Sequence, residues 1–278
     1  MRNRRLVIGA LLVTSIAALG FVQATLDSSG TAPAATAPRF EVDPFWPKPL
    51  PNHWLLGSAI GVAVDSRDHV FVIHRRESLN ERTEIGAAAD PPTGSCCVPA
   101  PNILEFDPDG NLVNTWGGPG EGYDWPSSNH GLAIDHQDNV WIGGNGRGDA
   151  HLLKFTRDGR FLMQVGVPAE GTASNSTERF GGVAKVAFDV DANEAYVADG
   201  YRNKRVAVID MDNGTLKRYW GAYGNRPEDV DLGPYDPGAP PAQQFRNPVH
   251  CAEPTHDGLI YVCDRQNNRI QVFRTDGT

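Results

Sequence analysis

Two histidines stand at the same place in two related stretches of the chain. His130 opens the run HGLAID, and His250 opens the run HCAEPTHD. In two further stretches of the same kind, the matching position holds Ile60 and Ala184. If the stretches are units of a six-unit ring, histidines from alternate units converge on one point. Three histidine nitrogens with one open position make a catalytic zinc site, whose third histidine would lie beyond residue 278. The alternative is that both histidines are unrelated polar residues lining a channel.

The second segment of each unit ends in residues suited to an anionic ligand. The matching positions hold Arg75, Asn145, Tyr201 after Gly200, and Arg265. Arginine binds a carboxylate through paired hydrogen bonds, and a nearby arginine lowers the pKa of a tyrosine so that the phenolate acts as a base. A metal, a tyrosine and two arginines would suit an anionic substrate with a dissociable proton. Two alternatives stay open: Arg265 as an ion-pair partner between units, and Arg75 as a solvated loop charge.

The elements that must position these residues are short strands. Each unit has an alternating apolar strand, a polar turn with Asp, Asn or Gly, and a second strand rich in Val, Ile and aromatic residues. A third strand, ending in a turn such as DPDG or TRDG, follows in each unit, and a fourth strand follows in each complete unit. The four units begin at residues 60, 130, 184 and 250.

A four-stranded antiparallel unit repeated every ~40–60 residues is typical of a β-propeller. We therefore predict an all-β fold with about four propeller blades over residues 40–278. A β-sandwich with similar turns is the alternative, and the equal phase of the turns argues against it. The last unit stops in the hairpin turn of FRTDGT, so we expect a C-terminally incomplete fragment of a six-bladed ring. A small four-bladed ring closed by residues 40–56 is the alternative.

The first forty residues predict export. Three arginines precede the apolar run from Leu6 to Val22, and a small-residue cleavage site follows it. We predict a signal peptide over residues 1–24 and a disordered linker over 25–39, with an uncleaved anchor as the alternative. After cleavage no segment would span a membrane, and the protein would be periplasmic or extracellular. The net charge of −9 and the lack of a basic stripe exclude nucleic acid as a partner.

The four cysteines could pair in an oxidising compartment. Cys251 and Cys263 lie symmetrically about a turn and would face each other across a hairpin. A bond between directly opposed strand neighbours is geometrically awkward, so a disulfide and two buried thiols stay open there. Cys96 and Cys97 are adjacent in an insertion over residues 77–101, and one of them reaching Cys251 is a third possibility.

These residues resemble NHL-repeat six-bladed propellers, and among them the peptidyl-α-hydroxyglycine α-amidating lyases. The resemblance covers about residues 60–273. Its carriers are the segments GVAVD…VFVIHR, HGLAID…NVWI, VADGYRNKR and NPVHCAE…VCDRQNNRIQVF. The repeat pattern is specific only for the fold, whereas the ordered set of His, Tyr and Arg is more discriminating.

The resemblance implies a reaction and three catalytic residues. A C-terminal α-hydroxyglycine would be split at its N–Cα bond into an amide and glyoxylate, so the substrate would be a small molecule or peptide with a carboxylate. By the resemblance, Tyr201 is the catalytic base, Arg75 lies against the substrate, and Arg265 is a second, supporting arginine.

The resemblance also implies two metal ions. His130 and His250 would be two zinc ligands, and the backbone carbonyl groups of Val62 and Leu132 would hold a structural calcium ion. The chain departs from the family at several points, among them the CC pair at Cys96 and Cys97 and the strand end WIGGN, and two of the departures bear directly on the site. The third zinc histidine is absent from these 278 residues, and Arg202 stands where the family has a half-cystine after the tyrosine.

The sequence is compatible with three functions. The first is a zinc-dependent lyase, or a hydrolase of similar geometry. The second is a non-catalytic propeller whose loops bind a protein or glycan partner. The third is a calcium-dependent lactonase, which needs carboxylate and asparagine ligands in the channel; the sequence shows no clear channel glutamate, so this function ranks last.

Overall fold

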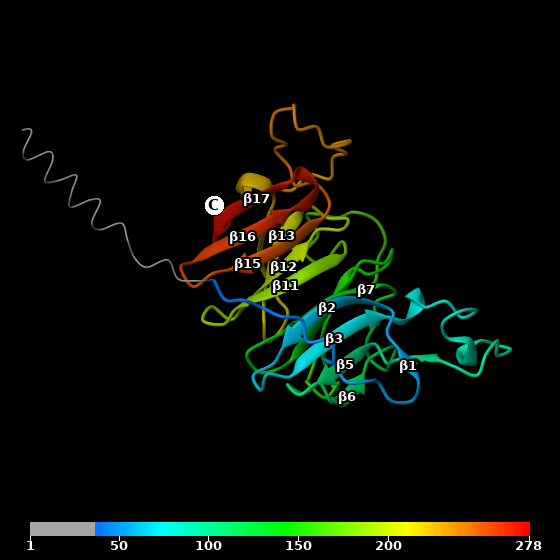
Figure 1. Ribbon diagram of the computed structural model, residues 1–278. Coiled ribbons are helices and arrows are strands. Elements are labelled where there is room, and N and C mark those ends of the chain that lie inside the picture. Colours follow the sequence, from blue (N-terminus) through cyan, green and yellow to red (C-terminus); the bar gives the residue numbers. More distant parts are fainter. Residues whose placement is uncertain (1–36) are drawn as a thin grey trace, which may run out of the picture. The chain divides into compact units, whose positions relative to one another are not determined.

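The computed structural model describes residues 37–278 (Figure 1), and the chain divides into two compact units. Residues 37–44 belong to the first unit, and Phe45–Thr278 form the second, which contains every candidate site residue. The predicted signal peptide and most of the predicted linker lie outside the described residues. No helix within residues 37–278 is long and apolar enough to span a membrane.

The second unit is built from antiparallel sheets, which we call blades 1 to 4 in chain order. Blade 1 consists of β2 (Ser58–Val64), β3 (Val70–Arg75), β5 (Ile103–Phe106) and β6 (Leu112–Trp116). Blade 2 consists of β7 (Asn129–Ile134), β8 (Val140–Gly144), β9 (His151–Phe155) and β10 (Phe161–Gly166). Blade 3 consists of β11 (Val183–Asp189), β12 (Glu194–Asp199), β13 (Arg205–Asp210) and β14 (Leu216–Trp220). Blade 4 has β15 (Val249–Pro254), β16 (Leu259–Asp264) and β17 (Arg269–Arg274).

The repeated aspartate turns explain why the hairpins recur at equal phase. The carboxylate of Asp65 accepts hydrogen bonds from the backbone N–H groups of Arg67 and His69 in the β2–β3 turn. Asp135 accepts the same pair of bonds, from the second and fourth residues after it, in the β7–β8 turn. The side chain therefore satisfies the backbone donors that the tight turn leaves unpaired.

The first strands of consecutive blades lie side by side around a common centre, as the labels β2, β7, β11 and β15 show in Figure 1. Apolar clusters fill the space between neighbouring blades. Phe71, Ile73, Leu132 and Phe155 belong to the cluster between blades 1 and 2. This radial packing of four-stranded sheets confirms the predicted all-β propeller blades of NHL type.

The segment before β2 covers blade 1. Strand β1 (Trp54–Leu55) pairs in parallel with β4 (Val98–Pro99), and Trp46 and Leu50 pack on the buried side chains of blade 1. Residues 54–55 thus pair with the insertion after β3 and not with blade 4. The four-bladed ring closed by residues 40–56 is therefore not formed.

Short 3₁₀ helices lie in the connections. They are η1 (Arg76–Ser78), η2 (Gly86–Ala88), η3 (Ala222–Gly224) and η4 (Arg265–Asn267). The predicted insertion after β3 contains η1, η2 and β4 and extends away from blade 1 (Figure 1).

Candidate functional site

Each first strand carries a β-bulge at its start, at the position that the sequence repeats align. The pairing with the second strand skips Ile60 in β2, Ala184 in β11 and His250 in β15. In β7 it skips Gly131, directly after His130. A bulge bends the strand and turns a side chain away from the sheet face that it would otherwise occupy. The bulges therefore direct both histidines to one place.

His130, Tyr201 and His250 meet although they come from three different blades. The phenol oxygen of Tyr201 lies 2.7 Å from Nε2 of His130 and 3.2 Å from Nε2 of His250. The two imidazole rings are 5.4 Å apart, centroid to centroid, and nearly perpendicular. The structure thus brings together the predicted zinc ligands and the predicted base.

The hydrogen bonds assign the protons in this cluster. Nδ1 of His130 lies 3.0 Å from the carbonyl oxygen of Ala184, which can only accept, so Nδ1 carries the proton. Nε2 of His130 then accepts a bond from the hydroxyl of Tyr201, whose oxygen accepts a bond from Nε2 of His250. Gly131 permits this arrangement, because a Cβ there would lie 2.7 Å from the same Ala184 oxygen.

Both imidazoles are neutral at physiological pH. Burial lowers the pKa of His130 to about 4, and the nearby positive charges of Arg75 and Arg265 act in the same direction. Burial also lowers the pKa of His250, with the charges of Arg265 and Lys185 acting in the same direction. Neutral imidazole is the form that binds a metal ion.

Two arginines flank the cluster. Arg75 is half-buried, donating from Nε to the carbonyl oxygen of Asn129 (3.0 Å) and from Nη2 to Oδ1 of Asn145 (2.9 Å). It is therefore held beside His130 and is not a freely solvated charge. Arg265 is exposed and makes no side-chain hydrogen bond or ion pair with residues 37–278, so its guanidinium remains available to an anion.

A charged pair at the centre was not anticipated from the sequence. Lys185 in β11 and Glu253 in β15 form an ion pair of 2.7 Å between the first strands of blades 3 and 4. The available signal was a charged residue inside each otherwise apolar strand. Lys185 contributes to the lowered pKa of His250, so this pair belongs to the electrostatic surroundings of the site.

Comparisons with known proteins find relatives of the chain, although no protein-family model matches it. The peptidylglycine alpha-amidating monooxygenase of Rattus norvegicus is 26% identical over 231 residues, which cover 81% of this chain and 22% of that protein. The peptidyl-alpha-hydroxyglycine alpha-amidating lyase 1 of Drosophila melanogaster is 25% identical over 242 residues, or 82% of this chain and 39% of that protein. NHL repeat-containing protein 3 of Mus musculus is 27% identical over 250 residues, which cover 86% of this chain and 58% of that protein.

The chain resembles the amidating lyases and the NHL-repeat proteins. It spans about a fifth of the length of the amidating monooxygenases that it matches. A solved structure of a protein of unknown function from Bacteroides thetaiotaomicron aligns with a TM-score of 0.50 at 15% identity, covering 78% of this chain and 47% of that one. At that identity the likeness concerns the fold alone.

The two positions assigned to calcium lie on neighbouring first strands. Val62 is in β2, with its side chain 62% exposed, and Leu132 is in β7, with its side chain buried between blades 1 and 2. Gly61 lets these strands approach closely, because a Cβ there would lie 3.0 Å from the backbone nitrogen of Leu132. A calcium role for the two carbonyl groups stays a prediction.

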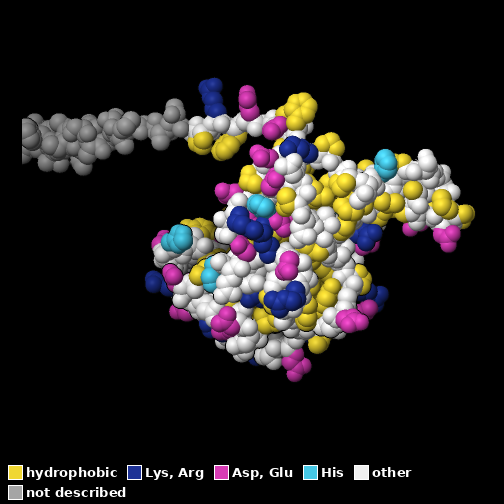
Figure 2. Space-filling model, turned by 90° about the horizontal axis from the view of Figure 1, so that it is seen from below, with side chains coloured by type: hydrophobic (Ala, Val, Ile, Leu, Met, Phe, Trp, Pro, Cys, Tyr) yellow, Lys and Arg dark blue, Asp and Glu magenta, His cyan; other side chains and the backbone are white. Residues whose placement is uncertain are grey.

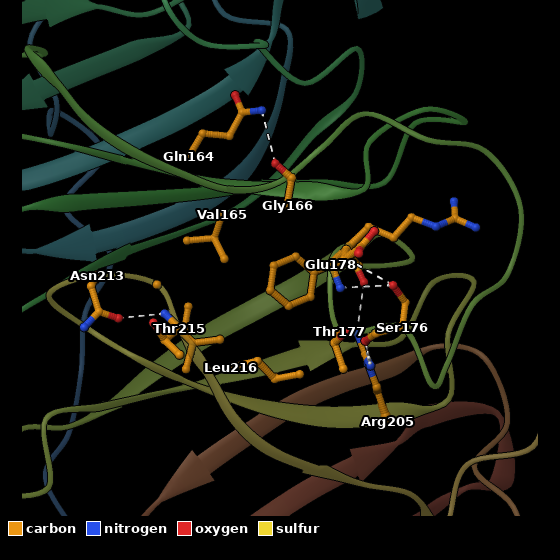
Figure 3. Close-up of a pocket in the computed structure, with 14 residues that line it drawn as sticks. Gln164, Val165, Gly166, Ser176, Thr177, Glu178, Arg205, Asn213, Thr215 and Leu216 are labelled. Atoms are coloured by element: carbon orange, nitrogen blue, oxygen red, sulfur yellow. Dashed lines mark hydrogen bonds between the residues drawn. The ribbon is translucent and has the colours of Figure 1, made fainter.

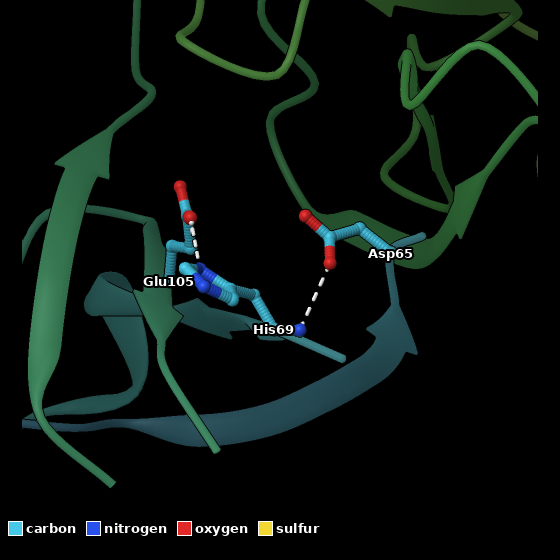
Figure 4. Close-up of side chains that lie close together, drawn as sticks. All are labelled: Asp65, His69 and Glu105. Carbon is cyan, nitrogen blue, oxygen red and sulfur yellow. Dashed lines mark hydrogen bonds and ion pairs between the residues drawn. The ribbon is translucent and has the colours of Figure 1, made fainter. Parts of the chain in front are cut away.

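A second group of possible metal ligands lies at the opposite ends of the strands. Asp65, His69 and Glu105 approach one another in blade 1 (Figure 4). Nδ1 of His69 lies 2.7 Å from Oε1 of Glu105, and the guanidinium of Arg157 in blade 2 lies 2.6 Å from Oδ2 of Asp65 and contacts Glu105. Because a guanidinium already neutralises both carboxylates, this cluster is a salt-bridge network between blades.

The cysteines pair in two bonds. Cys251 and Cys263 are register partners across the β15–β16 hairpin and form a disulfide. Cys96 and Cys97 are bonded to each other within the insertion. The alternatives of two buried thiols and of a bond from the insertion to Cys251 are therefore not realised.

A cavity of about 370 Å³ lies between the outer strands of blades 2 and 3 (Figure 3). Its lining includes Val165, Phe180 and Leu216, together with Arg205. Arg205 is saturated by Asp199 and by backbone carbonyl groups, so it holds structure and offers nothing to a ligand. No residue of the His–Tyr cluster lines this cavity.

Positive charge does not gather on the face of the molecule that Figure 2 shows. In Figure 2 the Lys and Arg side chains are scattered among acidic ones on the face shown and do not form a stripe. Because binding to a phosphate backbone requires clustered positive charge, the absence of a nucleic-acid partner stays a prediction.

Proposed function

We propose that the chain is a metal-dependent β-propeller enzyme that cleaves the N–Cα bond of an α-hydroxyglycine-type carbinolamide to an amide and glyoxylate. One observation carries the proposal: the hydroxyl of Tyr201 lies within hydrogen-bond distance of Nε2 of both His130 and His250. If the histidines were unrelated polar residues lining a channel, side chains from three blades would have no reason to converge in this way. The relative named as an amidating lyase supports the same assignment.

The residues present could supply two of the protein ligands of a zinc ion. His130 and His250 are neutral, and Nδ1 of His130 carries the proton that it donates to Ala184. The unprotonated Nε2 of His130 is therefore the atom that would bind the metal, as in many histidine metal sites. Within residues 37–278 the two histidines do not belong to a group of three His, Cys, Asp or Glu residues whose ligand atoms all lie within 4.8 Å of one another. When bound, zinc would supply Lewis acidity toward the substrate oxygens and so ease loss of the hydroxyl proton.

Tyr201 is the residue that we propose to move this proton. In the tyrosinate form its oxygen takes the proton from the substrate hydroxyl, the carbonyl group of glyoxylate forms, and the N–Cα electron pair passes to the amide nitrogen. Return of the proton to that nitrogen completes the amide. The reaction balances without an oxidant or a reductant, since it only redistributes one proton and one electron pair.

The arginines select the substrate. Arg75 and Arg265 place two positive charges close enough to His130 to lower its pKa. The same field attracts the carboxylate of an α-hydroxyglycine, and the guanidinium of Arg265, which has no partner among residues 37–278, can bind it directly. A non-catalytic propeller is the competing function, and the relative named NHL repeat-containing protein 3 is no less similar to the chain. The convergent cluster favours the enzyme.

Metal content and glyoxylate release test the proposal. We expect near-stoichiometric zinc in the wild type and in His256→Ala, which removes an exposed turn histidine, and loss of zinc in His130→Ala and His250→Ala. Tyr201→Phe should keep its zinc and release glyoxylate from an N-acyl-α-hydroxyglycine about 10²–10⁴-fold more slowly. If the zinc content were unchanged in both histidine variants, the proposal would be overturned in favour of a propeller that only binds a partner.

Two further proposals accompany this function. The carbonyl groups of Val62 and Leu132 would hold a structural calcium ion, which elemental analysis of the zinc-loaded protein would detect as a second metal. The protein would be exported after cleavage behind residue 24, and N-terminal sequencing of the secreted chain would locate that cut.

A further inference from the structure

Tyr201 depends on two blades other than its own. It lies in the turn over residues 200–203 that follows β12 of blade 3, whereas His130 belongs to blade 2 and His250 to blade 4. The distances from Tyr201 to the two rings are therefore set by whatever ties this turn to each neighbouring blade.

Arg202 ties the turn to blade 2. Its Nη1 donates to the carbonyl oxygen of Gly146 (2.7 Å), and its Nη2 donates to that of Asp149 (2.7 Å). Both acceptors lie in the loop over residues 145–149, which follows β8. The carboxylate of Asp149 braces this loop by accepting bonds from the backbone N–H groups of Ser127 and Gly146. Arg202 thus reaches a loop that is held in place within blade 2 by the carboxylate of Asp149.

Asn247 ties the same turn to blade 4. Its side-chain amide donates to the carbonyl oxygens of Gly200 and Asn203, each at 2.9 Å. Asn247 precedes His250 by three residues, so the two ends of the turn are fixed to the start of β15. Close approach is possible because Gly200 has no side chain: a Cβ there would lie 2.0 Å from the carbonyl oxygen of Val249.

Blade 3 holds the turn independently of both clamps. The backbone N–H of Tyr201 donates to Gly182 (3.1 Å), and that of Arg202 donates to Gly181 (2.6 Å). Loss of either side-chain clamp should therefore leave the turn folded and free it only toward one neighbour.

We infer that Arg202 and Asn247 are positioning residues that hold Tyr201 against His130 and His250, respectively. The planar guanidinium of Arg202 spans two carbonyl groups at once, which a lysine cannot do with the same geometry. That these two residues position a catalytic base rests on the proposed function, whereas their effect on the placement of the rings does not.

The two clamps differ in one respect that an assay can detect. The loop that Arg202 holds also holds Arg75, because Oδ1 of Asn145 accepts a bond from Nη2 of Arg75 (2.9 Å). Release of that loop loosens both the base and the arginine proposed to face the substrate. Release of Asn247 loosens only the contact between Tyr201 and blade 4.

Ring-to-ring nuclear Overhauser effects in the full chain, labelled in Tyr and His, test the placement. Wild type should show contacts of Tyr201 with both histidines, whose ring centroids lie at 4.9 and 5.9 Å. Arg202→Met should lose the contact with His130 and keep the one with His250, and Asn247→Leu should do the reverse. Arg157→Met, which cuts a salt-bridge network at the opposite ends of the strands, is the matched control and should keep both.

Kinetics provide the second readout. Arg202→Met should lower kcat and raise KM, Asn247→Leu should lower kcat alone, and Arg202→Lys should recover part of the loss and serves where the methionine variant does not fold. Both contacts surviving in both variants would overturn the inference even in an active enzyme. A wild type without zinc or activity, but with the expected pattern of ring contacts, would overturn the proposed function and support the clamp.

Discussion

Replacing Gly200 by alanine should separate blades 3 and 4 at the candidate site. Gly200 lies against the backbone of β15, and an added Cβ would lie 2.0 Å from the oxygen and 2.2 Å from the nitrogen of Val249. Real Cβ contacts are essentially never under 3.0 Å, so the two backbones must move apart by at least the missing 1.0 Å. Neither contact atom belongs to a flexible side chain that could turn away.

The cost has two parts. Overpacking of this kind costs about 1–3 kcal/mol. The shift also lengthens the bond of 2.9 Å from Asn247 to the Gly200 carbonyl group, and a hydrogen bond of this type contributes about 1 kcal/mol. We therefore expect Gly200→Ala to lower the free energy of unfolding by about 2–4 kcal/mol. His250 moves with β15, so zinc affinity should fall as well.

Urea denaturation and zinc titration would measure both effects. The matched control is Gly148→Ala, because Gly148 has an ordinary backbone conformation and no atom within 4 Å of the added Cβ. The control should unfold and bind zinc like the wild type. If Gly200→Ala matched the control in both assays, the close approach of the Tyr201 turn to β15 would be refuted.

Three other changes follow from the structure. Bonds from Arg218 lower the pKa of Glu194 from 4.5 to about 2, so this carboxylate stabilises the fold above pH 4.5 and its contribution is lost as the pH falls toward 2. Wild type should therefore lose about 3 kcal/mol more than Glu194→Gln over that interval in chemical denaturation; parallel curves would contradict this. Gly131→Ala should weaken zinc binding, because its Cβ would lie 2.7 Å from the Ala184 oxygen that orients His130; unchanged binding would exclude that bond as the orienting contact. Thiol alkylation followed by mass spectrometry should label no cysteine before reduction, and Cys251→Ser should expose one reactive thiol at Cys263; labelling of the untreated wild type would contradict the two bonds.

Much of the fold can be predicted from the sequence because its signals are local. Alternation of apolar residues and the aspartate turns, such as those at Asp65 and Asp135, act within a few residues of one another. The four hairpins, and the equivalent position of the turn in each repeat, can therefore be predicted from the sequence. The same phase also picks out His130 and His250 as equivalent positions, and the ordered family signatures add Tyr201.

Other features depend on contacts between blades and could not be read along the chain. The sequence allowed Arg75 to be a solvated charge, and only the packing of blade 1 on blade 2 places Asn129 and Asn145 around it. In the sequence, Asp65, His69 and Glu105 are separate polar residues. Only the packing of blade 2 on blade 1 brings Arg157 against the carboxylates of Asp65 and Glu105.

The sequence by itself determined the repeating strands, the turns and the residue types available for chemistry. The tertiary structure decided which of those residues meet. Tyr201 reaches His130 and His250 because bulges turn the first strands and because Arg202 and Asn247 tie one turn to two neighbouring blades. Contacts between residues about 50 to 70 positions apart arise only when sheets pack, since no local backbone preference acts over that distance.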